Sequence, residues 1–213
     1  MKNRQFVYDF SKGDGKNKTL LGGKGANLCE MTQIGLPVPP GFVITTEACL
    51  DHLEQKKSGL NPELSNQIRT AMEALEKETG KKFGDPTNPL LVSVRSGAAM
   101  SMPGMMDTIL NLGLNEASVI GLIKISKNER FVYDLYRRLI QLFGNIALGM
   151  KDEDFSIIFD NIKKENKVAE DVDLDAAALK KTCEGFLDMV EKKTGKPFPQ
   201  DPYVQLDMAV EAV

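Results

Sequence analysis

Residues 90–115 read LLVSVRSGAAMSMPGMMDTILNLGLN, and the rest of the chain is organised around this stretch. Residues 90–94 are mostly apolar and lie between Pro89 and Gly97, which predicts a mostly buried β-strand. The strand ends on Arg95, whose guanidinium stays protonated at any working pH and fits the oxygens of a phosphate or carboxylate. The sequence therefore predicts an anion site at this strand end, with a structural salt bridge as the alternative.

The residues after this strand, MSMPGMM at 100–106, place four methionines around a Pro-Gly turn. Glycine lets the backbone approach a ligand closely, whereas methionine clusters are more often adaptable core filler. Both interpretations stay open at this point. Residues 108–114, TILNLGL, then predict a second strand or extended segment that closes on Gly113.

A second glycine-rich element, GGKGAN at 22–27, begins a helical pattern. Its glycines put the ammonium of Lys24 beside backbone N–H groups at a helix N-terminus, which favours phosphate binding. The element is not a Walker A loop, because no glycine lies five positions before Gly23 and Gly25 stands where Ser or Thr would hold magnesium. A tight start to a helix with a solvated lysine is the alternative. Both interpretations of this second element stay open at this point.

The composition limits the class of protein. A chain of 213 residues with 42% hydrophobic content can bury a core, as one domain or as one domain with an inserted subdomain. The net charge of −3 offers no basic field, which argues against nucleic-acid binding. We find no apolar run of 18 residues and no signal peptide, and the three dispersed cysteines fit a reducing cytosol. We therefore expect a cytoplasmic protein without a membrane span and without metal-binding residues of its own.

Before residue 114 the pattern alternates between strands and helices. The single histidine, His52, lies in a helical segment without a nucleophile near it in sequence, so we expect a surface or boundary position. We expect Thr46 to cap that helix, and residues 11–18 to form an exposed polar turn. The predicted elements are strands at 6–10 and 42–45 and helices at 47–57 and 61–80.

After residue 114 the pattern becomes helical, and Asn115 is expected to cap the first helix. Arg137 and Arg138 lie on the longest helix, where an ordinary charged face is the alternative to a functional role. The sequence near 80 is repeated near 195, and each copy is expected to end a helix. A last helix begins near 203 without a C-terminal cap, which we take as a sign that the polypeptide continues. Three apolar stripes carry the helical prediction: Phe131, Leu135, Leu139, Leu142, Phe143 and Ile146; Phe155, Ile158, Phe159 and Ile162; and Leu179, Phe186, Leu187 and Val190.

Two long blocks resemble a known family. Residues 94–115, VRSGAAMSMPGMMDTILNLGLN, and residues 20–42, LLGGKGANLCEMTQIGLPVPPGF, are similar to the N-terminal nucleotide-binding domain of the pyruvate, phosphate dikinase family. The resemblance implies an α+β fold of the ATP-grasp type, in which two lobes clamp ATP. This chain is similar to the first lobe with its all-helical inserted subdomain. We therefore expect a lobe at 1–114, a helical subdomain at 115–196 and a return segment at 197–213.

The resemblance also implies site residues. Lys24 and Arg95 correspond to the phosphate-binding and catalytic lysine and arginine of the family, and Gly104 and Met106 to a loop over the phosphates. Arg138 falls at a third basic position near the nucleotide. These roles agree with the chemistry of the residues, because cations offset charge on the transferring phosphates. The implied cofactors are ATP and Mg²⁺, with the magnesium-binding carboxylates in a second lobe that this chain lacks.

The family reaction converts ATP, phosphate and pyruvate into AMP, diphosphate and phosphoenolpyruvate through a phosphohistidine. The implied partners are the phosphohistidine domain and the pyruvate-binding barrel of the same polypeptide, with homodimerisation through those domains as a further option. His52 matches none of the family's functional residues, so we expect an inactive fragment of the enzyme. Two alternatives stay open: a fragment of a pyruvate, water dikinase, and a stand-alone nucleotide-binding module.

Overall fold

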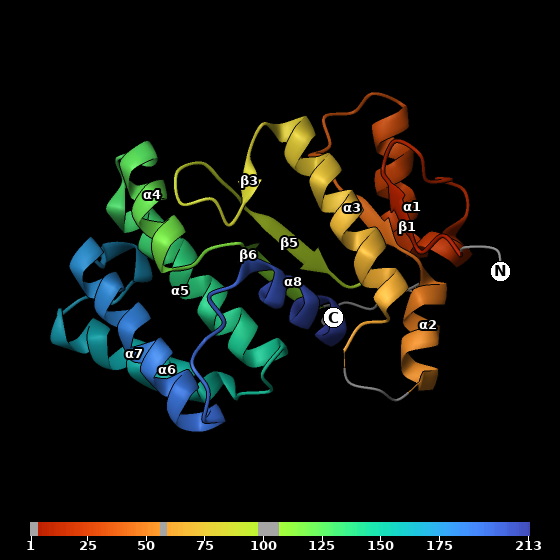
Figure 1. Ribbon diagram of the computed structural model, residues 1–213. Helices are drawn as coiled ribbons and strands as arrows, with labels where there is room; N and C mark the ends of the chain where they lie inside the picture. The colour runs from red at the N-terminus through yellow and green to blue at the C-terminus, as the bar shows by residue number, and fades with distance from the viewer. Residues whose placement is uncertain (1–3, 56–58, 98–106) are drawn as a thin grey trace. The chain divides into compact units, whose positions relative to one another are not determined.

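The computed structural model describes residues 4–55, 59–97 and 107–213 (Figure 1). Within these residues helices predominate, and the strands form three two-stranded sheets. The fold class is therefore α+β, as the sequence predicted. The chain forms two compact units, the first from residues 1–80 and 95–107 and the second from residues 81–94 and 108–213.

In the first unit, one long helix packs against an antiparallel pair of strands, in which Val7 pairs with Ile44 and Asp9 with Phe42. Leu21, Ala26 and Cys29 of the helix are buried there against Val43. The elements are β1 (Val7–Asp9), α1 (Lys18–Gln33), β2 (Phe42–Ile44), α2 (Thr46–Gln55) and α3 (Pro62–Thr79). Strand and helix positions follow the predicted pattern closely.

Helix α3 begins and ends where local signals predicted. The side chain of Asn61 accepts a hydrogen bond from the Glu63 N–H at 2.8 Å, and Pro62 occupies the first turn. Gly80 ends the helix in the left-handed conformation, with φ 65°. The buried face is the predicted stripe of Leu64, Ile68, Met72 and Leu75.

The turn at 11–18 differs from its prediction, because its two glycines are buried rather than exposed. A Cβ atom on Gly13 would lie 2.5 Å from Cys29 Sγ, and one on Gly15 would lie 2.8 Å from Glu30 Cβ. The Gln33 side chain also donates to the Gly13 carbonyl at 2.6 Å. Small residues in this turn thus allow it to pack directly on α1.

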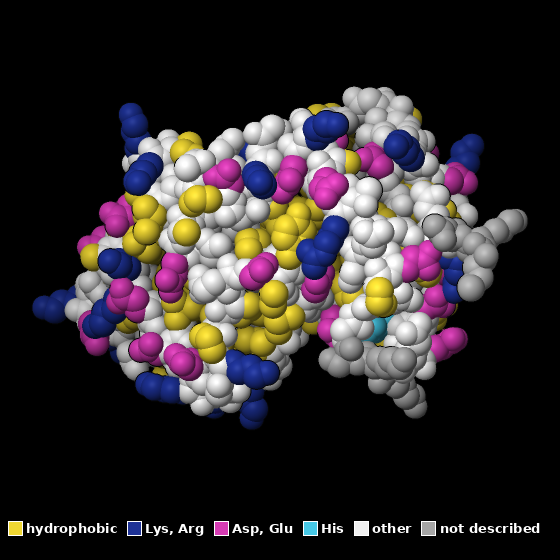
Figure 2. All heavy atoms as spheres, viewed as in Figure 1, with side chains coloured by type: hydrophobic (Ala, Val, Ile, Leu, Met, Phe, Trp, Pro, Cys, Tyr) yellow, Lys and Arg dark blue, Asp and Glu magenta, His cyan; other side chains and the backbone are white. Residues whose placement is uncertain are grey.

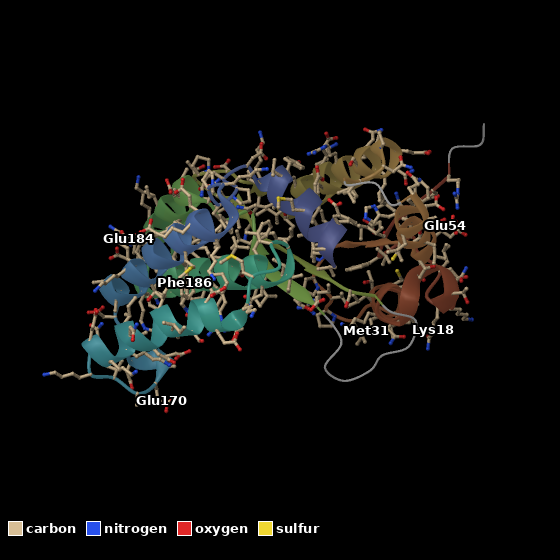
Figure 3. The ribbon with its side chains drawn as sticks, turned by 90° about the horizontal axis from the view of Figure 1, so that it is seen from below. Lys18, Met31, Glu54, Glu170, Glu184 and Phe186 are labelled. Atoms are coloured by element: carbon tan, nitrogen blue, oxygen red, sulfur yellow. The ribbon has the colours of Figure 1, made fainter. Side chains whose placement is uncertain are left out.

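In the second unit, α5 lies at the centre and packs on β6, α4, α6, α7 and α8 (Figure 1). Figure 3 shows Phe186 of α7 among the helices of this unit, whereas Glu184 of the same helix faces outward. The elements are β3 (Lys82–Phe83), β4 (Pro89–Leu90), β5 (Val92–Arg95, whose last residue belongs to the first unit), β6 (Thr108–Leu112), α4 (Glu116–Ser126), α5 (Glu129–Ile146), α6 (Asp152–Glu165), the short 3-10 helix η1 (Asp171–Asp173), α7 (Ala176–Thr194) and α8 (Pro202–Ala212).

The strand predicted at 90–94 is divided at Leu91 between β4 and β5. Leu90 is buried, but Ser93 is exposed and Val92 and Val94 are only half-buried, so the prediction of a mostly buried strand was wrong. Strand β5 belongs to a two-stranded sheet, which leaves alternate side chains facing solvent.

The apolar stripe predicted for α5 only partly matches the buried face of this helix. Phe131 is 47% exposed, and the buried face instead includes Val132, Tyr136 and Ile140 together with the predicted Leu139 and Phe143. This face of α5 is buried because it packs on α7 and β6. The charged Arg137 is buried as well.

Other local predictions for this unit were correct. Asn115 caps α4 in a reciprocal arrangement with Ser118, and Gly195 ends α7 with φ 72°. The predicted domain boundaries at 114 and 196 stay a prediction, and the compact units group the residues differently, with 81–94 and 108–114 beside the helices.

The surface carries no large field of one sign on the face shown in Figure 2, where acidic and basic side chains are interspersed. The low net charge of −3 agrees with this distribution. None of the helices in the described part of the chain has the length and apolar character needed to cross a bilayer.

Candidate functional site

Helix α1 is interrupted at Gly22, which has φ 68° and ψ 166°. This conformation is essentially restricted to glycine, and it separates a first turn, from Lys18 to Leu21, from the longer helical segment that follows. The Asn17 side chain caps the first turn by accepting from the Leu20 N–H at 3.1 Å. Lys24 therefore lies in the first turn of the second helical segment, at a helix N-terminus as predicted.

Thr46 supports this break, and its predicted role as a helix cap was wrong. Its hydroxyl donates to the carbonyl oxygens of Thr19 at 2.6 Å and Leu20 at 3.3 Å. Helix α2 is capped instead by Thr45, whose side chain accepts from the Ala48 N–H at 3.3 Å. Carbonyl groups at the end of a helical turn need such partners, and Thr46 supplies one here.

The two elements singled out from the sequence lie against each other in the first unit. A Cβ atom on Gly22 would overlap the carbonyl oxygen of Gly97, so only glycine permits this approach. The Ser96 N–H donates to the Asp107 carbonyl at 3.2 Å and fixes the backbone beside Arg95. The kink that precedes Lys24 thus contacts the segment that carries Arg95.

Both cations of this site are available to an anion. Lys24 is half-buried and Arg95 is exposed, and neither side chain forms a hydrogen bond or ion pair with any residue that the structure describes. The Ser96 hydroxyl is buried without a hydrogen-bond partner within the same described ranges. The salt bridge considered for Arg95 therefore has no counterpart among these residues. A helix N-terminus with two uncompensated cations is suited to phosphate groups.

The other predicted site residues belong to the second unit or lie outside the residues that the structure describes. Arg138 lies on α5 in the second unit, where its Nε donates to Asp134 Oδ2 at 2.8 Å. Gly104 and Met106 lie outside the described residues. The sequence analysis missed Asp134, although acidic and basic residues three and four positions apart on a helix are a recognisable pairing signal.

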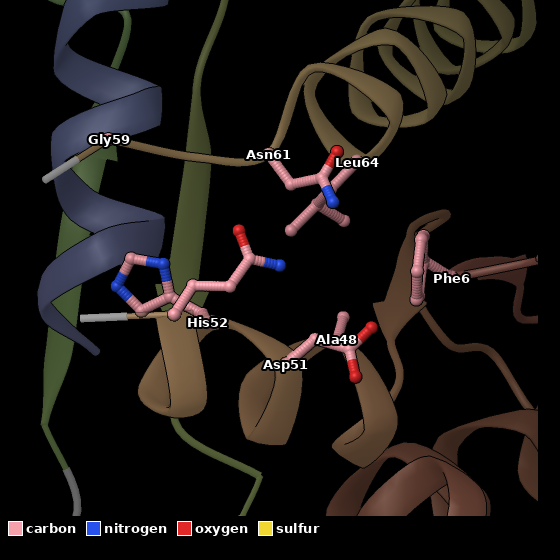
Figure 4. A pocket seen from close by; sticks show the side chains of 8 residues that line it. Phe6, Ala48, Asp51, His52, Gly59, Asn61 and Leu64 are labelled. Atoms are coloured by element: carbon pink, nitrogen blue, oxygen red, sulfur yellow. The ribbon is translucent and has the colours of Figure 1, made fainter. Parts of the chain in front are cut away.

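His52 lies on α2 beside a small pocket shown in Figure 4. It is half-buried, in agreement with the predicted boundary position. Asp51 in the same pocket already pairs with Arg4 at 2.6 Å. Among residues 4–55, 59–97 and 107–213 we find no group of three or more His, Cys, Asp or Glu side chains placed to hold a metal ion.

Comparison with known proteins shows similarity of the chain to one family. A family model described as "Pyruvate phosphate dikinase, AMP/ATP-binding domain" matches residues 18–78, which include Lys24. The chain is 55% identical over 210 residues to a pyruvate, phosphate dikinase of Entamoeba histolytica and 49% identical over 210 residues to that of Clostridium symbiosum. It is 47% identical over 214 residues to the chloroplastic enzyme of Flaveria trinervia.

These alignments cover 98% of this chain for the first two relatives and 100% for the third. They cover only 24%, 24% and 22% of the relatives, so the chain spans about a quarter of their length. Each of these relatives is named as a phosphate dikinase, which disfavours the pyruvate, water dikinase alternative.

Proposed function

This chain is related over almost its whole length to pyruvate, phosphate dikinases, and we propose that it supplies part of the ATP-binding site of such an enzyme. The observation that carries the proposal is the contact between Gly22 and Gly97, which joins the Lys24 and Arg95 elements. In this proposal residues 1–114 belong to an ATP-grasp lobe, residues 115–196 form its inserted helical subdomain, and residues 197–213 are the return segment.

The chemistry of the two cations supports phosphate binding. Lys24 offers a point charge beside a helix N-terminus, and Arg95 offers a planar fork that binds two oxygens at once. Together they would orient the β- and γ-phosphates and offset the charge that develops during phosphoryl transfer. Magnesium, held by carboxylates of another lobe, would neutralise the same phosphates.

The proposed reaction of the complete enzyme converts ATP, phosphate and pyruvate into AMP, diphosphate and phosphoenolpyruvate through a phosphohistidine. The phosphohistidine domain and the pyruvate-binding barrel would lie elsewhere in the longer polypeptide. We expect this chain alone to form no AMP in a coupled assay. Sustained turnover would contradict its assignment to the nucleotide-binding part only.

A stand-alone nucleotide-binding module is the second candidate, because the Lys24 and Arg95 elements meet within the first unit. The size of the native polypeptide on an immunoblot discriminates the two. A band several times larger than 23.5 kDa supports the dikinase, and a 23.5 kDa band supports the module. The compartment stays a prediction, because the cytoplasm was inferred from cysteine usage and the Flaveria relative is named as chloroplastic.

Calorimetric titration with Mg-ATP tests the site directly. We expect Lys24→Ala and Arg95→Ala each to weaken binding by about 1–3 kcal/mol, the usual cost of losing a charged contact. Lys18→Ala, at an exposed position of the same helix, and Arg4→Ala, whose guanidinium pairs with Asp51, are the matched controls. Equal effects of controls and site variants, or no binding by the folded parent chain, would contradict the proposal.

A further inference from the structure

The hydroxyl of Thr46 occupies two carbonyl groups in the first turn of α1. In a continuous α-helix the N–H of each residue donates to the carbonyl four residues earlier. The carbonyls of Thr19 and Leu20 would therefore accept from the N–H groups of Gly23 and Lys24. Here the Thr46 hydroxyl donates to the Thr19 carbonyl at 2.6 Å and, with longer geometry, to the Leu20 carbonyl at 3.3 Å.

The kink in α1 releases the two N–H groups that these carbonyls would otherwise bind. A helical hydrogen bond requires helical φ and ψ at the three residues between its donor and its acceptor. Gly22 lies in this interval for both Gly23 and Lys24, and its φ of 68° and ψ of 166° prevent both bonds. Within the described ranges neither N–H group has an acceptor outside α1. Both donors are thus the unsatisfied first N–H groups of the second helical segment.

Thr46 is placed by contacts that do not involve α1. It is the first residue of α2, and the buried Thr45 before it donates its N–H to the Phe6 carbonyl at 2.9 Å. The Thr45 side chain also caps α2 by accepting from the Ala48 N–H at 3.3 Å. The hydroxyl of Thr46 therefore reaches the first turn of α1 from a fixed helix start within the same unit.

We propose that Thr46 is a positioning residue whose hydroxyl holds the first turn of α1 apart from the N–H groups of Gly23 and Lys24, which then bind a phosphate of the nucleotide. This inference rests on the proposed function, because it takes Lys24 as part of the ATP-binding site. It adds two backbone donors to that site. The Lys24 ammonium supplies charge, the N–H groups supply direction, and Thr46 acts through them without contacting the nucleotide.

Thr46→Val removes the hydroxyl with little change in the shape of the side chain. The carbonyls in the first turn of α1 then lose their donor, and the nearest replacements are the two N–H groups of the second segment. We expect the affinity for Mg-ATP to fall about tenfold, the effect of losing one charged hydrogen bond. Calorimetric titration of the 213-residue chain measures the change. Unchanged affinity would overturn the inference.

Two further variants separate positioning from a general loss of stability. Thr46→Ser keeps the hydroxyl, so its affinity for Mg-ATP should stay within about twofold of the parent chain. Thr45→Val removes the buried cap of α2 and should lower the midpoint of thermal unfolding more than Thr46→Val. Its affinity for Mg-ATP should nevertheless stay within about twofold. A tenfold loss in either variant would overturn the inference, because any disturbance at the start of α2 would then suffice.

Amide chemical shifts identify the proposed contact itself. When Mg-ATP saturates the parent chain, we expect the N–H protons of Gly23 and Lys24 to shift downfield, as donors to a charged oxygen do. The Gly35 N–H, which donates to the Thr32 carbonyl at 3.1 Å, is the control and should not shift. A saturated chain without a shift at Gly23 and Lys24 would overturn the inference.

Amide hydrogen exchange without nucleotide separates this inference from the proposed function. We expect fast exchange at the N–H groups of Gly23 and Lys24 in the parent chain, and slower exchange in Thr46→Val, where the carbonyls recapture them. Slow exchange in the parent chain, or equal exchange in both chains, would overturn the positioning role whether or not Mg-ATP binds. The expected exchange combined with no Mg-ATP binding by the parent chain would overturn the proposed function and the phosphate contact, and would leave only the effect of Thr46 on the backbone established.

Discussion

Gly22 is the residue on which the candidate site most directly depends. Its φ of 68° and ψ of 166° are strained for any other residue, and an added methyl group would overlap the Gly97 carbonyl. We expect Gly22→Ala to lower the free energy of unfolding by about 3 kcal/mol and to abolish Mg-ATP binding. Urea denaturation measures the loss of stability.

Gly35 offers a matched control for backbone strain. It also has a positive φ, 81°, but an added Cβ atom would meet nothing within 4 Å. Gly35→Ala should therefore cost only about 1 kcal/mol. Equal losses in the two variants would mean that overlap with the Gly97 carbonyl adds nothing to the cost of the Gly22 substitution.

Asp134 makes stability depend on pH. Burial raises its pKa less than Arg137 and Arg138 lower it, so the folded chain binds this proton less readily than the unfolded chain. The contribution is present above an unfolded pKa of about 4 and is lost as the pH falls through the lower folded value. The difference in unfolding free energy between the parent chain and Asp134→Asn should be largest near neutrality and shrink below about pH 4. Urea titrations across this range check it, and a difference independent of pH would contradict it.

Among the elements, a glutamine joins a helix to the backbone of another segment in each unit. In the second unit, Gln205 of α8 accepts from the Gly113 N–H at 3.1 Å and donates to the carbonyls of Leu114 at 2.9 Å and Pro199 at 2.8 Å. In the first, Gln67 of α3 bonds at 2.7–3.1 Å to backbone groups at the start of the chain: Arg4, Phe6 and Val7.

Burial should decide what each glutamine contributes. Gln205 is 0% exposed, so Gln205→Leu leaves three backbone groups without partners away from water and should cost about 3 kcal/mol. Gln67 is half-buried, and water can replace its side chain, so Gln67→Leu should cost only about 1 kcal/mol. Urea denaturation of both variants tests this order, and the reverse order would contradict the assignment.

Elements defined by residues close together in the sequence were predicted correctly, and those defined by residues far apart in the sequence were not. Caps at Asn61 and Asn115 act within one turn, so the sequence located the starts of α3 and α4 correctly. The buried face of α5 depends on which elements cover the helix, so the apolar pattern of the sequence did not predict all of its residues. Thr46 was misassigned because its partners, in the first turn of α1, are distant in sequence.

The whole molecule consists of two compact units, and each should respond to its own core substitutions. Phe186 of the second unit is fully buried, with its ring centre 4.9 Å from that of Phe155. Phe186→Ala should cost about 3–5 kcal/mol and accelerate amide hydrogen exchange in α5, α6 and α7, with little change in α1 and α3. Exposed Ile157 on α6 is the control, and its replacement by Ala should cost less than about 0.5 kcal/mol. Equal acceleration in α1 and α3 would show that the two units unfold together.

The sequence by itself determined the α+β class, the capped helices, the two candidate cations and the resemblance to one enzyme family. These features depend on composition, local hydrogen bonding and long runs of shared residues. Only the tertiary structure decided that Gly22 contacts Gly97, that Arg137 is buried beneath Phe159 and that Asp134 serves two arginines. Such contacts depend on which surfaces are brought together and dehydrated, and no local pattern encodes the free energy of that packing.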